Sequence, residues 1–202
     1  MAIDQSKPAI KPDQNPEDIH RSISSHYSTL AFQIGRSGNL QNEPIRLRVS
    51  SSSMSPLLQP GDFIDLEVAQ PESLKRGDMV TFQNNGDLLT HRLVYAGPQS
   101  CLTKGDAALG FDPPIDRSRL LGRVVAFERD GKLTIMRGWR WDIINRIAGW
   151  LSFWEGWAVR LAGSIFHRDR EAPLPRTLPF LARLVSGLLR LPVKILLKLF
   201  AL

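Results

Sequence analysis

Residues 45–56 read IRLRVSSSSMSP, and the rest of the chain is organised around them. The alternating run at 45–49 predicts a strand, and residues 59–62, which read QPGD, predict the turn that closes the segment. A row of four serines is an ordinary polar loop in most proteins. One of these serines can instead be a nucleophile, provided that a base lies close enough to take the hydroxyl proton.

His91 is the natural candidate for that base. It lies in residues 88–95, LLTHRLVY, where strand alternation places it on one face with Leu89 and Leu93. A histidine on an apolar face can equally be a core residue with satisfied hydrogen bonds. Residues 102–112, LTKGDAALGFD, supply two carboxylates. A carboxylate that accepts the second imidazole proton fixes the tautomer and the orientation of the ring.

The order of these segments resembles a known family. Ser-Met-x-Pro at 53–56 is followed by KRGDMVTF at 75–82, THR at 90–92, TKGD at 103–106 with Asp112, and GRV at 122–124. This order resembles type I signal peptidase, within the signal peptidase and repressor-type peptidase superfamily. The resemblance is to the Ser/His branch, which is found in archaea, the endoplasmic reticulum and some bacteria, and it covers residues 45–136.

The resemblance implies roles for five residues. Ser53 corresponds to the nucleophile, His91 to the general base and Asp112 to the acid of the Ser/His branch. Asp106, in the TKGD segment at 103–106, is a further catalytic candidate, and Ser51 stands where a serine can help to bind the oxyanion. The implied substrate is a precursor or signal-like peptide that is cut after small side chains.

The sequence departs from the family pattern in three places. Ala107 stands where asparagine is common after Gly-Asp, and Leu57 stands where threonine is usual after the proline. The membrane-spanning helix that usually precedes the serine is not expected either, because no run before Ser53 approaches the roughly 20 apolar residues that a span needs.

Two alternatives for the chemistry are weighed against the histidine base. Lys104 could be a base of the kind that the lysine branch uses, although His91 fits the pattern better. Neither a metal nor another cofactor is expected, because no cluster of His, Cys and carboxylates has ligand spacing.

The composition is typical of one folded domain with appendages. The 202 residues are 43% hydrophobic, which is enough for a packed core. Short alternating segments predict a mainly β fold, a small antiparallel, barrel-like domain at 45–136 with hairpin turns at 84–87 and 130–131. An N-terminal arm with a short helix at 1–44 precedes this β-rich serine peptidase domain, and a basic helical tail follows at 137–202. The single cysteine, Cys101, is expected to be a small buried side chain.

Charge and tryptophan both concentrate in the tail. Residues 137–202 hold eleven Lys or Arg against four Asp or Glu, and all five tryptophans lie at 139–157. The net charge of the whole chain is +6. The basicity therefore belongs to the tail and favours an anionic membrane surface or an acidic partner.

Two amphipathic helices are predicted in the tail, at 138–166 and at 180–202. Charged residues, among them Glu155, interrupt the apolar pattern of the first helix, so that a membrane span is not expected. Basic amphipathic helices with aromatic side chains lie in the membrane interface. The tail therefore predicts a membrane-surface partner, and the alternative is that the helices cover the β domain or pair with another protein.

The expected function is that of a serine endopeptidase, peripherally associated with a membrane. No secretory signal is recognised in residues 1–16, which favours a protein made in the cytoplasm. The alternative is a non-catalytic, membrane-associated adaptor that binds peptides with an idle peptidase fold. A self-cleaving DNA-binding repressor is disfavoured because residues 1–44 are poorly patterned for a helix-turn-helix, and no nucleic-acid partner is expected.

Overall fold

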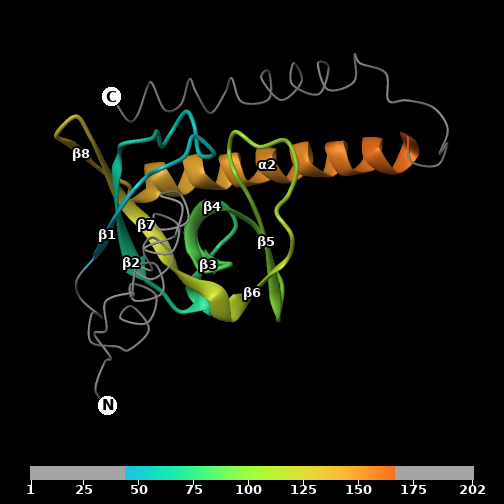
Figure 1. Cartoon of the computed structure of the whole chain (residues 1–202), viewed down its shortest axis with the longest axis horizontal. Helices are drawn as coiled ribbons and strands as arrows, with labels where there is room; N and C mark the ends of the chain where they lie inside the picture. Colours follow the sequence, from blue (N-terminus) through green and yellow to red (C-terminus); the bar gives the residue numbers. More distant parts are fainter. Residues whose placement is uncertain (1–43, 167–202) are drawn as a thin grey trace, which may run out of the picture.

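The computed structural model describes residues 44–166, with side chains up to residue 161. The predicted N-terminal arm and its helix, and the second helical segment at 180–202, lie outside the described residues. Within this range the elements are β1 (Ile45–Arg48), β2 (Phe63–Val68), η1 (Pro71–Ser73), β3 (Met79–Asn84), β4 (Asp87–Ala96), β5 (Ser100–Lys104), β6 (Ile115–Asp116), η2 (Arg117–Arg119), β7 (Leu120–Arg129), β8 (Lys132–Ile135) and α2 (Trp139–Phe166). Figure 1 shows α2 running along one side of the strands.

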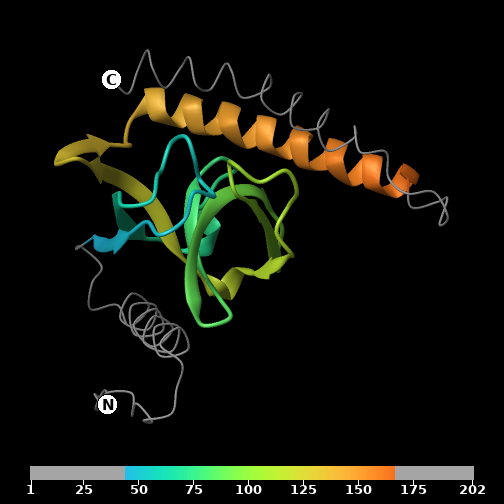
Figure 2. The ribbon, with the colours of Figure 1, turned by 45° about the horizontal axis from the view of Figure 1, so that its top comes forward.

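All of these strands belong to one antiparallel sheet. Its order is β1-β2-β7-β3-β4-β5-β6, and β8 pairs with β7. Every pair of neighbouring strands is antiparallel. Figure 2 shows that β3, β4 and β5 curl round instead of forming a flat layer. The predicted mainly β, antiparallel fold is therefore confirmed.

Two hairpins are closed by turns that the sequence predicted. β3 and β4 are joined through Asn85 and Gly86, whose φ angles are 50° and 90°. β7 and β8 are joined through Asp130 and Gly131, whose φ angles are 51° and 77°. Positive φ at both central residues is the geometry of a type I′ turn, which matches the twist of the strands and favours Asn-Gly and Asp-Gly.

The core consists of two clusters of buried side chains. The first joins β2 and β7 to residues 49–62, which we call the serine loop, and to the first turns of α2; it includes Met54, Leu57, Leu58, Ile64, Leu66, Trp141 and Ile144. The second includes Val80, Phe82, Leu93, Cys101, Ile115 and Leu120. Burying one large apolar side chain is worth about 1.5–3 kcal/mol. Apolar burial thus holds both the serine loop and α2 onto the sheet.

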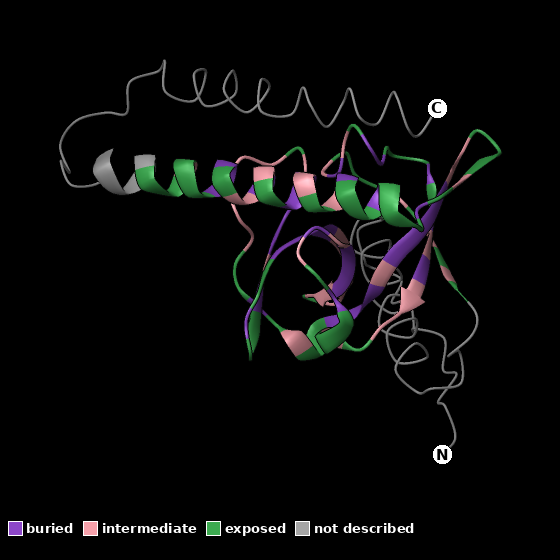
Figure 3. Cartoon of the chain, turned by 180° about the vertical axis from the view of Figure 1, so that it is seen from behind, coloured by how far each residue is buried: buried purple, intermediate pink, exposed green. Residues whose placement is uncertain are grey.

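Helix α2 has a packed face and an exposed face. Ile144 and Ala148 are buried on the packed face, whereas the exposed side of the helix is visible in Figure 3. Large apolar side chains follow the exposed face at intervals of three to seven residues, and they are Trp139, Ile143, Trp150, Trp154, Trp157 and Leu161. We call these residues the tryptophan stripe. Within residues 44–166, no helix combines the length and the apolar character that crossing a bilayer requires.

Candidate active site

The serine loop presents Ser53 at the surface on a rigid support. Backbone hydrogen bonds between Val49 and Asp62 and between Gly61 and Val49 close the base of the loop. Inside it, Met54 and Leu58 are almost fully buried and anchor the loop to the core, whereas Ser53 remains half-exposed.

An ion pair ties the C-terminal end of the serine loop to β7. Arg129 donates to both carboxylate oxygens of Asp62, at 2.9 and 2.7 Å, and to the carbonyl of Leu57 at 2.8 Å. Burial alone raises the pKa of Asp62, but hydrogen bonds from Arg129 and from the backbone of Gln59 outweigh it and leave that pKa below its usual value. Asp62 is therefore held as a carboxylate, and the loop that carries Ser53 is fixed at both ends.

Three candidate residues form a continuous chain of hydrogen bonds. The Nε2 atom of His91, on β4, lies 3.1 Å from the Oγ atom of Ser53. Its Nδ1 atom lies 2.7 Å from the Oδ2 atom of Asp112. A carboxylate can only accept a hydrogen bond, so we assign the imidazole proton to Nδ1, which leaves Nε2 free to accept the hydroxyl proton of Ser53. This is the arrangement that activates a serine hydroxyl.

The orientation of His91 and Asp112 is set by their neighbours. His91 is buried, and its ring meets the ring of Phe82 in an edge-on contact with centroids 6.1 Å apart. Asp112 accepts a second hydrogen bond at 2.7 Å from the hydroxyl of Thr103 on β5, and its backbone N–H donates to the carbonyl of Thr103. Thr103 lies in the TKGD segment at 103–106, but neither its residue type nor its spacing predicts a contact with the acid.

Gly105 lets the segment after β5 pass directly beside the serine. A Cβ atom at Gly105 would lie 2.9 Å from the carbonyl oxygen of Ser53 and 3.3 Å from the Nε2 atom of His91. The backbone N–H of Ala107 then donates to the same carbonyl of Ser53 at 2.8 Å. A larger residue at 105 would push this segment away, so a glycine is required by close approach.

Ser51 lies beside the serine hydroxyl, as the resemblance implied. Its Oγ atom is 3.1 Å from the Oγ atom of Ser53, and its side chain is exposed. A hydroxyl rotates freely and can donate to an oxygen that develops charge next to Ser53. Four of the five candidate residues, Ser51, Ser53, His91 and Asp112, are therefore brought together.

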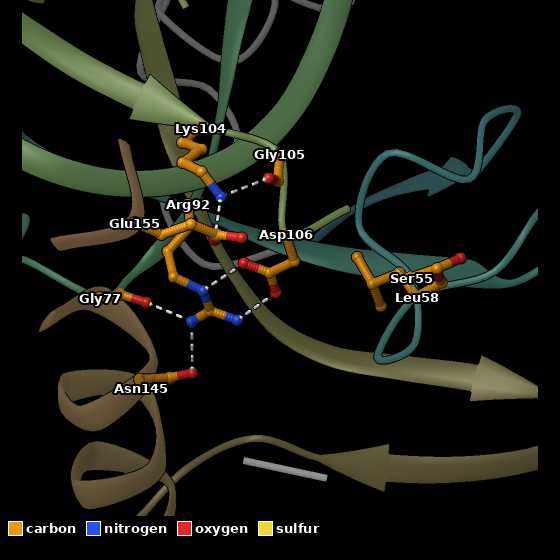
Figure 4. A network of polar contacts seen from close by, with 9 residues as sticks. All are labelled: Ser55, Leu58, Gly77, Arg92, Lys104, Gly105, Asp106, Asn145 and Glu155. Carbon is orange, nitrogen blue, oxygen red and sulfur yellow. Dashed lines mark hydrogen bonds and ion pairs between the residues drawn. The ribbon is translucent and has the colours of Figure 1, made fainter. Parts of the chain in front are cut away.

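Asp106, the fifth candidate, contacts an arginine instead of His91. Its two carboxylate oxygens accept from the Nε and Nη2 atoms of Arg92 at 2.8 and 2.7 Å. Arg92 is buried and also donates to the carbonyl of Gly77 at 2.7 Å and to the side chain of Asn145 at 3.2 Å (Figure 4). Asp112 is thus the carboxylate that contacts the imidazole, and Asp106 is the partner of the neighbouring guanidinium.

Lys104, the alternative base, is directed toward α2. It is fully buried, and its Nζ atom lies 2.7 Å from the Oε2 atom of Glu155 (Figure 4). Glu155, which in the sequence only interrupted an apolar pattern, is buried as well. The Lys104 amine contacts a carboxylate of α2, whereas the imidazole of His91 contacts the hydroxyl of Ser53, so this geometry favours His91 as the base.

Other features of the described residues do not extend the site. A polar cleft of about 350 Å³ lies near the first turns of α2, and its lining, which includes Lys75, Arg123 and Arg146, contains none of the candidate residues. In the part of the chain that the structure describes, no three His, Cys, Asp or Glu side chains are grouped as metal ligands would be. Cys101 is buried, and this burial raises the pKa of its thiol.

Comparison with known proteins does not identify a family for this chain. No protein-family model matches the chain, and no curated protein matches its sequence. What the site can do therefore has to be argued from its own residues.

Proposed function

We propose that this protein is a serine endopeptidase of the signal peptidase kind, with Ser53 as nucleophile, His91 as general base and Asp112 as the acid. The observation that carries the proposal is the chain of hydrogen bonds from Ser53 through His91 to Asp112. These residues are 38 and 21 positions apart in the sequence, so local structure does not explain their meeting. A nucleophilic hydroxyl, a base and an acid that orients the base, connected in this order, form the arrangement used for nucleophilic acyl transfer.

The proposed reaction proceeds by two acyl transfers. The Oγ atom of Ser53 attacks the peptide carbonyl carbon while the Nε2 atom of His91 takes the hydroxyl proton. The imidazolium, stabilised by Asp112, then gives this proton to the leaving amine as the C–N bond breaks, and an acyl ester on Ser53 remains. Water then attacks the ester carbonyl while His91 takes a proton from this water. His91 gives the proton to the Oγ atom of Ser53 as the ester bond breaks, and the carboxylic acid product leaves.

Ser51 is proposed to stabilise the oxyanion of both tetrahedral intermediates. Its hydroxyl is adjacent to the attacking oxygen, where a donor interacts more strongly with the developing charge than with the carbonyl of the substrate. Loss of one such donor costs on the order of 10²–10³-fold in rate. Replacing Ser51 by alanine should therefore slow the reaction without abolishing it.

The surroundings of Ser53 suit an extended peptide substrate. Strand β1 leads directly into the serine loop and lies at an end of the sheet order, with β2 as its partner among the described residues. An unpaired strand edge binds an extended peptide through main-chain hydrogen bonds. Preference for small side chains before the cut, as in a secretory precursor, is proposed on the resemblance alone.

We further propose that the tryptophan stripe of α2 contacts a membrane surface. Trp139 and Trp154 are 67% and 61% exposed, and a row of apolar side chains of this size is unusual on a surface that meets only water. Arg140, Arg146 and Arg160 are exposed on the same helix and suit anionic head groups. Tryptophan favours the depth of the membrane interface.

The function is tested with a serine-reactive fluorophosphonate probe and a peptide library read by mass spectrometry. We expect wild type to be labelled at Ser53 and to cleave peptides, and we expect Ser53→Ala and His91→Ala to lose both activities. Ser52→Ala, at the exposed neighbouring serine, is the matched control and should remain active. Cleavage that persists in His91→Ala would show that the base is wrongly assigned. A wild type that binds peptides without labelling or cleavage would support the adaptor instead.

A further inference from the structure

Helix α2 contacts residues that lie beside the candidate active-site residues in the chain, namely Arg92, Lys104 and Phe111. We propose that two neighbouring residues of this helix, Glu155 and Gly156, are positioning residues that hold Asp112 against His91. The proposal rests on the peptidase function proposed above. In this proposal α2 has two roles. One face of the helix positions the acid of the site, and the other face carries the exposed tryptophan stripe.

The segment between β5 and Asp112 is the part of the site that α2 can control. Its first residues touch the site directly, because Thr103 bonds to Asp112 and Gly105 lies against Ser53 and His91. Residues 105–114 contain no strand or helix, so hydrogen bonds of a regular element do not fix their path. The position of Asp112 therefore depends on individual contacts of this segment, which include its own hydrogen bonds to Thr103 and the contacts of the two ends of the segment with α2.

Glu155 holds the first end through Lys104. Lys104 lies between Thr103 and Gly105, the two residues that contact the site, and its side chain extends to Glu155 instead. Both charged groups are buried, with 0% and 6% of their side chains exposed. A buried charge that loses its partner is strongly disfavoured, so this ion pair fixes the distance between α2 and the end of β5.

Gly156 holds the second end through Phe111. Phe111 precedes Asp112, and a Cβ atom at Gly156 would lie 2.4 Å from two atoms of the Phe111 ring. The ring therefore rests directly on the backbone of α2, and it also lies near Phe153 of the same helix, with centroids 6.4 Å apart. Any side chain at position 156 would displace this ring, and we expect the displacement to be passed to the adjacent acid.

A third contact from the same helix reaches the residue beside His91. The side chain of Asn145 accepts from Arg92, and Arg92 in turn binds both oxygens of Asp106, which lies within the controlled segment. Figure 4 shows Asn145, Glu155, Arg92 and Lys104 converging between α2 and the strands. The helix is therefore connected to β4, to the end of β5 and to the approach to Asp112.

The decisive variant is Gly156→Ala, which adds one methyl group against Phe111. We expect its rate of labelling by the fluorophosphonate probe to fall on the order of tenfold or more under conditions where the protein is fully folded, because small displacements of reacting groups reduce rates strongly. Folding is followed separately by urea denaturation. The double variant Phe111→Leu with Gly156→Ala makes room for the methyl group and should recover most of the rate.

The role of Glu155 is tested by replacing both members of the ion pair, Lys104→Met with Glu155→Met. Removing both charges avoids an unpaired buried charge, so this variant is expected to fold. We expect a slower labelling rate with little change in the concentration of probe that gives half-maximal rate. A rate equal to that of wild type in both this variant and Gly156→Ala would overturn the proposal.

A measurement that needs no activity separates this proposal from the proposed function. A ring N–H that donates to a carboxylate gives a proton NMR signal far downfield, so the Nδ1–H of His91 reports directly on Asp112. The signal should be present in wild type, absent in Asp112→Ala, and lost or broadened in Gly156→Ala. If wild type is not labelled by the probe, the peptidase function fails, and this signal still decides whether α2 positions the acid. An unchanged signal in Gly156→Ala contradicts the positioning role.

Discussion

Replacing Asp106 by asparagine should remove a large part of the stability of this protein. The Arg92 side chain is 1% exposed and has three partners, namely Asp106, the carbonyl of Gly77 and the side chain of Asn145. Of these partners only Asp106 carries a negative charge. An asparagine at 106 removes this charge and offers an NH₂ group in place of one of the two acceptor oxygens.

The size of the effect follows from the burial of the arginine. Removing one partner of a buried ion pair costs about 3–5 kcal/mol, because the other charge is left in a poorly solvated site. Solvent screening reduces this value little, since the side chain of Asp106 is itself only 15% exposed. For a chain of this length about 2–4 °C of melting temperature is lost per kcal/mol, so the melting temperature should fall by roughly 6–20 °C.

Urea denaturation followed by circular dichroism measures this loss, and two further variants serve as controls. Asn145→Ala removes only one acceptor from Arg92 and should cost about 1 kcal/mol. The double variant Arg92→Met with Asp106→Leu removes both charges and should be much more stable than Asp106→Asn, because a buried pair can be replaced by apolar side chains at little cost. An Asp106→Asn protein within about 1 kcal/mol of wild type would refute the reasoning from burial.

Two further predictions concern the loop that carries Ser53 and the exposed side of α2. The lowered pKa of Asp62 means that its pair with Arg129 contributes stability above the unfolded-state pKa of about 3.9, and this contribution is lost as the pH falls through the lower folded-state pKa. The gap in urea midpoint between wild type and Asp62→Asn should therefore shrink from pH 6 to pH 2, and a constant gap would contradict the pair. Replacing Trp150, Trp154 and Trp157 together by serine should abolish co-flotation with anionic lipid vesicles while leaving the circular dichroism spectrum unchanged. If the triple variant still floats, the tryptophan stripe is not the membrane contact.

Local patterns in the sequence were enough to predict the class of fold. Alternation of apolar residues marked most strands, and the Asn-Gly and Asp-Gly pairs marked two hairpins, because these features depend on residues that are close together in the chain. Strand β6 was not predicted, since it has only two residues. Its partner, β5, lies on another segment, which local pattern does not reveal.

The sequence by itself also determined the candidate residues of the site. Ser53 and His91 are distinguished by their segments and by the order of those segments, without reference to the distance between them. Two carboxylates remained open as the acid that orients His91, because Asp106 and Asp112 lie in the same segment, residues 102–112. Their order in the chain carries no information about which one faces the ring.

Only the tertiary structure decided between the two carboxylates, and it did so through strand pairing. β5 lies beside β4 with Leu93 opposite Thr103, which brings the end of β5 next to His91. The segment after β5 then folds back onto Thr103, so that Asp112 reaches the imidazole while Asp106 reaches Arg92. The same packing pairs Lys104 with Glu155 on a helix 51 positions away. Such contacts depend on the register and packing of distant segments, which residue type and spacing cannot specify.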